Sequence, residues 1–355
     1  MSKWILRGIL VLIALLIVVV AGVSYWQYQY WNTPWGDEEQ RFFLEIPQGS
    51  TGREIAEQLR EKGVIEDVNT FLILADLRGV ADQMEAGEYE IRGEQTRFEV
   101  LNNLAEGNRY RHTVLIPEGW TQLQIVEKYD EMEICPKEDL MAHFEQLETF
   151  TNVAVAGPRG INAKIEGSLF PDTFYLEKNT PPVKISDRHL RRFDDVISEL
   201  HDEATAEGQP DWWWQNEDDP EIVQVHNITV LASIVEREAK EDIDRAKMAA
   251  VFVNRLEKGM PLQSDATIHY ALGDWSRPLT TSDLEVNSPY NTYQNVGLPP
   301  AAICNPGKAS LRAAMMPADI DALYFLSMPD GQTRYTADYD EFINWKNERK
   351  AILAE

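Results

Sequence analysis

The first strong pattern in the chain is a run of hydrophobic residues near the N-terminus. Residues 9–23 carry no polar side chain, and Lys3 and Arg7 precede them. A bilayer core about 30 Å thick needs roughly 20 helical residues, so residues 1–31 are predicted to hold one transmembrane helix. The basic residues ahead of the run predict a cytoplasmic N-terminus. A cleaved signal peptide is the alternative, but bulky aromatic residues follow the run where a cleavage site would need small ones.

Aromatic residues come directly after the apolar run and predict a belt at the far membrane interface. They are Tyr25, Trp26, Tyr28, Tyr30 and Trp31, and such residues concentrate where a bilayer meets water. Residues 32–41 are polar and are predicted to be a linker outside the cytoplasm. The sequence holds no second apolar run of comparable length, so a single pass is expected.

Residues 42–130 contain two related strand-turn-helix patterns. One begins at Ile46-Pro-Gln-Gly-Ser-Thr51 and the other at Ile116-Pro-Glu-Gly-Trp-Thr121. Each has a Pro-x-Gly turn followed by Thr at the N-cap position of a predicted helix. The interval predicts, in order, a helix over 68–77, a strand over 87–91 and a helix over 98–104. The pattern indicates one small α+β domain.

Residues 131–160 are polar and mixed, and they are predicted to bridge to a second α+β domain over 161–355. Helical periodicity, with stops such as Gly259 and Pro261, predicts the elements of that domain. The expected helices cover 184–206, 227–240, 245–258, 267–271, 308–315 and 339–354, and the expected strand covers 322–328.

Composition and charge exclude some partners. The chain has 355 residues, enough for about two domains with hydrophobic cores, and a net charge of -26. Nucleic acid is not expected to bind, because phosphate contact needs a basic surface. Cys135 and Cys304 are predicted to be two separate thiols, although an exported chain could pair them. The spacing of His and Cys indicates no metal site, and no cofactor is expected.

One carboxyl group lies on a helix face that is otherwise apolar. Leu231, Ile234, Val235 and Glu238 follow the i, i+3, i+4, i+7 spacing of a single face. Burial raises the pKa of a carboxyl group, as a general acid near neutral pH requires. Glu236 lies about 200° round the helix and should point elsewhere. The alternative is that Glu238 is an ordinary surface acid.

Two polar loops and one aromatic run offer further candidates. The loop after Pro261 is rich in hydrogen-bonding groups, and 288–307 combines tyrosines, amides and prolines that suit a carbohydrate. Each could equally be a structural turn. The run Trp212–Trp214 could stack on sugar, contact the membrane or pack onto its own domain.

Two kinds of hydrolytic site are alternatives to a single catalytic carboxyl group. A nucleophilic triad is not supported, because no GxSxG motif occurs. A glycosidase with paired carboxylates would need Glu236, Asp265 or Glu166 as its second acid.

Together these segments resemble the YceG-like family of endolytic murein transglycosylases. The resemblance rests on Leu231–Glu238, Val251–Gly273, Ser288–Gly307, Glu166–Tyr175 and the N-terminal apolar helix. It implies a LysM-like α+β subdomain over 42–130 before a mixed α+β catalytic domain. Ala266 and Cys304 differ from the residues expected in the motifs of this family, but neither replaces the acid.

The resemblance implies an enzyme of the inner membrane, with its catalytic domain in the periplasm. Its substrate would be nascent peptidoglycan, cleaved at the MurNAc–GlcNAc β-1,4 bond with formation of 1,6-anhydroMurNAc ends, which would limit strand elongation. Glycan-polymerising synthases would be partners. The general acid and base would be Glu238, with Glu236 as the competing assignment. Substrate would be held by Gln263, Asp265, Thr267, Tyr290, Asn291, Thr292, Tyr293, Glu166 and Ser168. The rival functions are a muramidase that uses water, a wall-binding scaffold without activity and a membrane-anchored adhesin or assembly factor.

Overall fold

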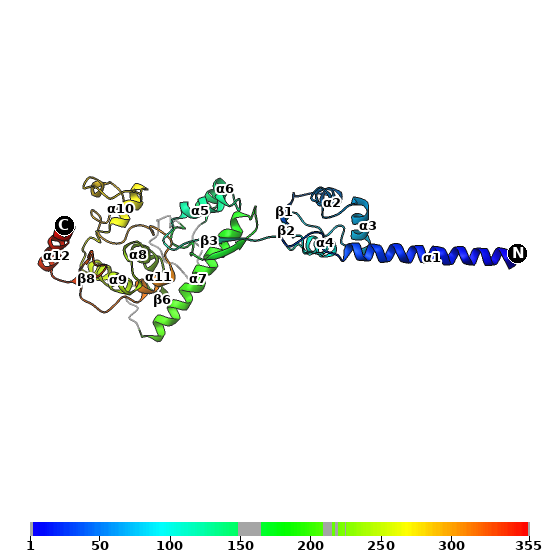
Figure 1. Ribbon diagram of the computed structural model, residues 1–355. Coiled ribbons are helices and arrows are strands. Elements are labelled where there is room, and N and C mark those ends of the chain that lie inside the picture. The colour runs from blue at the N-terminus through cyan, green and yellow to red at the C-terminus, as the bar shows by residue number, and fades with distance from the viewer. Residues whose placement is uncertain (1–2, 148–164, 209–214, 217–218, 224, 354–355) are drawn as a thin grey trace. The chain divides into compact units, whose positions relative to one another are not determined.

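The apolar run forms helix α1 (Lys3–Trp31) in the computed structural model, which describes residues 3–147, 165–208, 215–216, 219–223 and 225–353 (Figure 1). Within those residues, Arg7–Trp31 is the one stretch of helix long and apolar enough to cross a membrane by its length and composition. The chain divides into two units. Unit 1 comprises Met1–His112 with Tyr175–Lys178, and unit 2 comprises Thr113–Phe174 with Asn179–Glu355.

Unit 1 packs three helices and a two-stranded sheet around one core. Strands β1 (Arg41–Ile46) and β2 (Gly87–Arg92) pair antiparallel, with Leu44 opposite Tyr89. Both of those side chains are buried, as expected for alternating strand positions that face a core. The helices of the unit are α2 (Gly52–Glu61), α3 (Val68–Arg78) and α4 (Arg97–Ala105). The elements predicted over 68–77, 87–91 and 98–104 are thus confirmed.

The end of α1 is part of the core of unit 1, and this corrects one prediction. Trp31 was expected in the interfacial belt, but it is 5% exposed and its ring lies 6.3 Å from that of Phe71. The polar residues that follow are also fixed in place. Trp35 N–H donates to the Gln95 carbonyl at 3.2 Å, and its indole N–H donates to the Arg92 carbonyl at 2.7 Å.

Unit 2 is built around three mutually packed helices. They are α8 (Val225–Glu238), α9 (Asp242–Glu257) and α11 (Lys308–Met315), and the long helix α7 (Pro182–Ala206) lies against α11 (Figure 1). Apolar side chains from all of them form one buried cluster. The four helices match the expected positions within a few residues, because their apolar stripes are long and end at clear stop signals.

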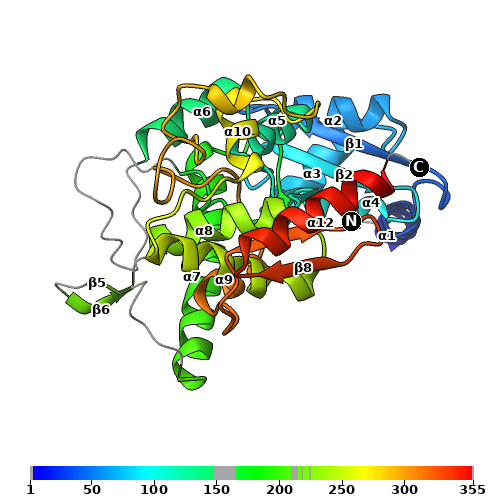
Figure 2. The same cartoon turned by 90° about the vertical axis from the view of Figure 1, so that its left-hand side faces the viewer.

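The other elements complete the described part of the chain. Strand β7 contacts both α9 and the C-terminal helix α12. Figure 2 shows α12 beside β8, the strand that pairs with β7. Strand β7 was expected, but its hairpin partner β8 was not. The elements are β3 (His112–Leu115), α5 (Gln122–Glu131), α6 (Lys137–Gln146), β4 (Thr173–Leu176), β5 (Gln215–Asn216), β6 (Asp219–Val223), α10 (Asp265–Leu272), the 3-10 helix η1 (Asp283–Glu285), β7 (Tyr324–Ser327), β8 (Thr333–Thr336) and α12 (Tyr339–Ile352). The sheets are two-stranded pairs: β1–β2, β3–β4, β5–β6 and β7–β8.

The two Pro-x-Gly turns belong to different units. Thr51 and Thr121 each cap the following helix with a capping box, which accounts for the repeated sequence pattern. The second turn lies in unit 2 and is bonded to the residues just before α11: Gly119 N–H donates to the Asn305 carbonyl at 2.9 Å, and Asn305 N–H donates to the Trp120 carbonyl at 2.8 Å. Of the bridging segment expected over 131–160, residues 148–160 lie outside the described part of the chain.

Candidate functional site

Glu238 is the last residue of α8, and its carboxyl group meets the start of α10. Its face of the helix is otherwise apolar, with Leu231, Ile234 and Val235 fully buried. The Ser264 hydroxyl donates a 2.6 Å hydrogen bond to Glu238 Oε1. Burial raises the pKa of Glu238 above its ordinary value, and the nearby Asp265 carboxylate adds to the rise. The negative end of the α8 dipole acts in the same direction.

Glu236, two residues earlier, is held by structural contacts. Its Oε1 lies 3.3 Å from an Arg245 guanidinium nitrogen, and both side chains are at most 10% exposed. Its Oε2 accepts a 3.0 Å hydrogen bond from Gly307 N–H. The carboxylate therefore has a cation and an amide donor already in place, and it joins α8 to α9 and to the start of α11. Glu238 and Glu236 occupy different environments, as the helical phase predicted.

Two polar loops lie side by side next to Glu238. Gln263 N–H donates to the Thr292 carbonyl at 3.1 Å, and Ser264 N–H donates to Thr292 Oγ1 at 3.0 Å. The hydroxyls of Thr267 and Thr292 lie 2.9 Å apart. The Tyr293 hydroxyl donates to Asp265 Oδ1 at 2.6 Å. The structure thus brings together five of the nine residues expected to hold substrate.

Exposure divides these residues into two kinds. The side chains of Gln263 and Asp265 are exposed and that of Tyr293 is half-buried, so a ligand can reach them. Thr267 and Thr292 are buried and bond to each other, which fixes the two loops together. Gln263 has a φ of 54°, in the left-handed region that residues other than glycine rarely adopt. Its strained backbone is held by the bond to Thr292.

Asn291 is fully buried, and its amide bonds within its own loop. Its Nδ2 donates to the carbonyls of Leu284 and Val286, and its Oδ1 accepts from Tyr293 N–H. Amide side chains often bond to nearby backbone groups in this way. The contacts of Asn291 therefore shape the loop that carries Tyr293.

Glu166, Ser168 and Tyr290 belong to a neighbouring network that reaches α10. Glu166 is 6% exposed, and its Oε1 accepts from Asn305 Nδ2 and from Gln122 N–H, each at 2.8 Å. Its Oε2 accepts from the Tyr270 hydroxyl at 3.4 Å, and the Tyr270 and Tyr290 rings lie 4.9 Å apart. Ser168 is also buried, in the turn whose flanking amides donate to Asn305 Oδ1. None of the contacts described for these three residues reaches Glu238 directly.

Sequence reasoning missed Trp275, which braces the site. Its ring stacks on His269 with centroids 5.4 Å apart, and the Arg237 guanidinium lies 3.8 Å from its centroid. Arg237 precedes Glu238 on α8, and His269 is on α10. Trp275 therefore joins the two helices that bring Glu238 and Ser264 together. A Trp just after a helix-ending glycine, Gly273, was the available signal.

Cys135 and Cys304 are both buried free thiols, so the expectation of separate thiols is confirmed. Burial raises the pKa of Cys135 to about 11 and also raises that of Cys304. The run Trp212–Trp214 lies outside the described residues. In the described part of the chain, His, Cys, Asp and Glu form no group of three or more that could hold a metal ion.

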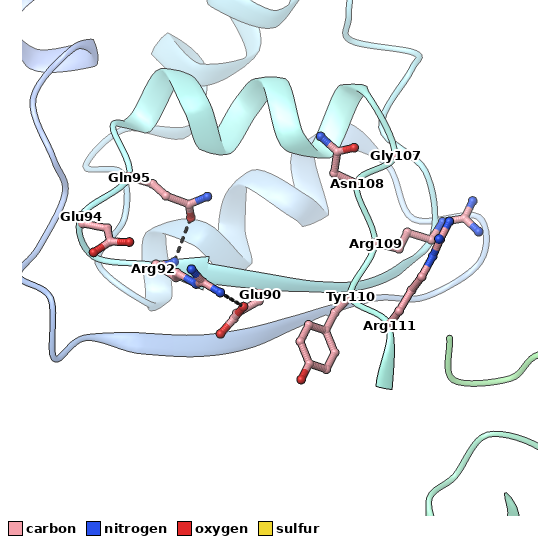
Figure 3. A pocket seen from close by; sticks show the side chains of 9 residues that line it. All are labelled: Glu90, Arg92, Glu94, Gln95, Gly107, Asn108, Arg109, Tyr110 and Arg111. Carbon is pink, nitrogen blue, oxygen red and sulfur yellow. Dashed lines mark hydrogen bonds and ion pairs between the residues drawn. The ribbon is translucent and has the colours of Figure 1, made fainter. Parts of the chain in front are cut away.

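Unit 1 contains a cavity of about 590 Å³ (Figure 3). Arg92 and Glu90 in its wall form a 2.7 Å ion pair with each other. Arg109 pairs with Glu177 at 3.0 Å, and Figure 3 shows its side chain pointing away from Glu90 and Arg92. Arg92 and Arg109 in the wall of this cavity are thus each already paired with a carboxylate, and the cluster around Glu238 is the better candidate for chemistry.

Comparison with known proteins gives consistent matches. The family model described as YceG-like matches residues 44–348. The chain is 31% identical over 332 residues to the endolytic murein transglycosylase of Bacillus subtilis, covering 88% of each chain. It is 28% identical over 323 residues to that of Streptococcus pneumoniae serotype 2, covering 83% of this chain and 56% of the relative. The crystal structure of a yceG-like protein from Listeria monocytogenes matches with a TM-score of 0.56 and 30% identity, over 86% of this chain and 99% of the other.

Proposed function

Because the chain belongs to the YceG-like family, we propose that it is an endolytic murein transglycosylase, a lyase that cuts peptidoglycan strands internally. The observation that carries the proposal is the environment of Glu238. Its pKa is raised by burial, and a Ser264 hydroxyl holds one of its oxygens. A raised pKa increases the fraction of the carboxyl group that is protonated at a given pH, and a protonated carboxyl group can deliver its proton to a leaving oxygen.

The reaction follows from one carboxyl group used twice. Protonated Glu238 gives its proton to the glycosidic oxygen between MurNAc C1 and the neighbouring GlcNAc, and the C1–O bond breaks. The positive charge that develops on the sugar ring is stabilised by the carboxylate just formed. The carboxylate then takes the proton of the MurNAc C6 hydroxyl as that oxygen bonds to C1. The product has a 1,6-anhydro end, no water is consumed, and Glu238 is protonated again.

A single acid is enough because the nucleophile belongs to the substrate. An oxygen held within the same sugar has a large effective concentration at C1. Hydrolytic glycosidases need a second carboxylate to activate water or attack the sugar. Glu236 is a poor candidate for that role, since it is paired with Arg245 and bonded to Gly307. The muramidase alternative would depend on Asp265, whose Oδ1 accepts from Tyr293.

We assign the substrate-holding residues by accessibility. Gln263, Asp265 and Tyr293 can donate to or accept from sugar hydroxyls and the N-acetyl group. Thr267, Thr292 and Asn291 set the shape of the two loops. Tyr290 and Glu166 support the neighbouring wall through Tyr270 on α10, and Ser168 lies in the turn that bonds to Asn305.

We also propose that α1 is an uncleaved anchor in the cytoplasmic membrane. Lys3 and Arg7 favour a cytoplasmic N-terminus, which puts both units on the outer side. An enzyme anchored there meets glycan strands as they are polymerised, so synthases are the partners to expect. The burial of Trp31 in the core of unit 1 supports retention of the helix, since cleavage before it would expose that core.

The test is mass spectrometry of products formed from uncrosslinked glycan strands. Full-length wild type in detergent is compared with Glu238→Gln and Glu236→Gln, because a chain starting after Trp31 would lack a core residue. Anhydro ends from wild type and Glu236→Gln, with none from Glu238→Gln, are expected. Products one water heavier would indicate the muramidase, and intact strands with wild type would indicate a scaffold. Loss of activity in Glu236→Gln alone would transfer the acid role to that residue.

A further inference from the structure

Helix α3 of unit 1 has an apolar face that its own core leaves uncovered. Val68, Phe71 and Ala75 are buried, but Ile73 is 59% exposed and Leu77 is 81% exposed. Ile73 and Leu77 are four residues apart, so they lie on the same side of the helix. Two large aliphatic side chains exposed together on a short helix indicate a surface that contacts something apolar.

This face adjoins the end of the apolar helix α1. Ile73 and Leu77 line a cavity of about 600 Å³ together with Val23, Gln27 and Tyr28 of α1. Figure 1 shows α3 beside the end of α1, on the side of unit 1 from which α1 extends. Val23 is the last residue of the uninterrupted apolar run. The exposed face of α3 is therefore level with the end of the membrane-spanning run.

The placement of α3 against α1 is fixed by several bonds. Glu66 N–H, just before α3, donates to the Tyr30 hydroxyl at 2.9 Å. An Arg97 guanidinium nitrogen donates to the carbonyls of Tyr30 and Thr33, each at 3.2 Å. The Glu66 bond and the packing of Trp31 on Phe71 hold α3 against α1, while Arg97 holds α4 against the same end of α1.

The distance along α1 decides what surrounds this face. Val23 and Trp31 are eight residues apart, which corresponds to about 12 Å along a helix. The 15 residues of the apolar run span about 22 Å, so a hydrocarbon core about 30 Å thick extends several residues beyond Val23, and the headgroup region adds roughly 5–8 Å beyond that core. Ile73 and Leu77 then lie at headgroup level or just inside it.

A cation lies at the same edge of the surface. Arg78 follows Leu77, also lines the cavity, and holds its guanidinium 3.5 Å from the centroid of the Phe98 ring. Aliphatic side chains beside an arginine match the two parts of a phospholipid, since the first contact acyl chains and the second binds phosphate. Because the chain has a net charge of -26, few parts of its surface can bind an anionic headgroup in this way.

We propose that the Ile73–Leu77 face of α3, with the groove between α3 and α1, is a phospholipid-binding surface on the outer leaflet. It holds unit 1 on the membrane, with Ile73 and Leu77 among the upper acyl carbons and Arg78 at the phosphates. The inference rests on the proposed membrane anchor and not on the transglycosylase activity.

The experiment places a fluorescent label at single cysteines in the full-length chain, reconstituted into vesicles of phosphatidylcholine and phosphatidylglycerol. The positions are Leu77→Cys, Val18→Cys within α1, and Asn108→Cys. Asn108 is the control position in unit 1. It lies just beyond the C-terminal end of α4, whereas Arg97, at the N-terminal end of α4, bonds to α1. Labelling of the parent chain measures the background from the two buried native thiols. Quenching is measured with lipids that carry a spin label near the headgroup or deep in the chain.

Shallow quenching at least threefold stronger at Leu77 than at Asn108 is expected, with deep quenching at Val18. Quenching at Val18 with none at Leu77 would overturn the inference and leave the anchor intact. No quenching at Val18 would overturn both. If position 77 is shielded only at a high protein-to-lipid ratio, a second copy of the chain covers it instead of lipid, and the inference is also overturned.

Discussion

The Ser264 hydroxyl donates a 2.6 Å hydrogen bond to Glu238 Oε1, joining the first residue before α10 to the last residue of α8. This bond stabilises the carboxylate form and so opposes the rise in pKa that burial causes. It also fixes the direction in which the other oxygen of the carboxyl group points. One hydroxyl at the start of a separate helix thus lowers the pKa of the proposed acid and orients its carboxyl group.

Ser264→Ala should raise the pKa of Glu238 further, because it removes a group that stabilises the anion. Activity of wild type should fall at high pH as Glu238 loses its proton, and in the variant this fall should occur at higher pH. The rate of anhydro-end formation should drop about tenfold, the value of one hydrogen bond to a charged group. A pH–rate profile measures both effects. Ser276→Ala is the matched control, since that hydroxyl donates to Asp274 at 2.7 Å. An unchanged profile in Ser264→Ala would remove its assigned role.

Glu236→Gln and Glu238→Gln should affect stability in opposite directions. Glu236→Gln leaves the buried Arg245 with the exposed Asp242 as its remaining anionic partner and should destabilise unit 2 by about 1–2 kcal/mol. The pKa of Glu238 is raised in the folded state, so its ionisation weakens folding above the ordinary pKa of Glu. Glu238→Gln should therefore melt higher than wild type at pH 8, and the difference should vanish below about pH 4. Thermal melts at both pH values test this. A lower melting temperature for Glu238→Gln at pH 8 would contradict the argument.

Tyr293→Phe should impair substrate processing with little effect on folding. The hydroxyl donates to Asp265 at 2.6 Å at the accessible side of the site. Its loss frees Asp265 to move and should lower kcat/KM roughly tenfold. Tyr335→Phe is the control, because that hydroxyl donates to Asp244 at 2.9 Å on another part of unit 2. Equal losses of activity in the two variants would show that the effect is general.

Gln263→Gly should stabilise the protein while reducing its activity. Glycine accepts a φ of 54° without strain, and relief of about 1 kcal/mol is expected. Substrate affinity should fall if the amide binds sugar. Asn179→Gly, at a φ of 57°, is the control and should leave KM unchanged. Denaturant melts and steady-state kinetics give the two readouts. Full activity in Gln263→Gly would limit the role of Gln263 to its backbone.

Local periodicity predicted much of the fold, because the sequence of a long helix shows which of its faces is apolar and where the helix ends. The position of Glu238 followed from three buried neighbours on the same face. Its partner Ser264 could not be assigned in this way, since their contact joins residues 26 positions apart. Trp31 was misplaced because an aromatic residue suits both a membrane interface and a core. Only the packing of Phe71 distinguishes the two.

The loop residues show a second limit. Asn291 has the chemistry of a sugar-binding residue, but its amide bonds to backbone groups within its own turn. Polar groups in a sequence do not reveal whether their hydrogen bonds are already made. The link from Glu166 to Asn305 spans 139 positions and was equally invisible. Thr267 and Thr292 were expected to hold substrate, and their bond to each other could not be read from the sequence.

The second Pro-x-Gly turn bears on how this protein can be divided or recombined. Gly119 and Trp120 are bonded to Asn305, and Arg237, beside the proposed acid, donates to the Gly119 carbonyl at 3.3 Å. A gene fusion that joined a foreign module at residue 131 would delete this turn and leave those groups unmatched. A crossover near residue 112 would carry it along. A part of the protein that can be transferred intact therefore begins before the second Pro-x-Gly turn. That turn resembles the first one in sequence, but the first one belongs to unit 1.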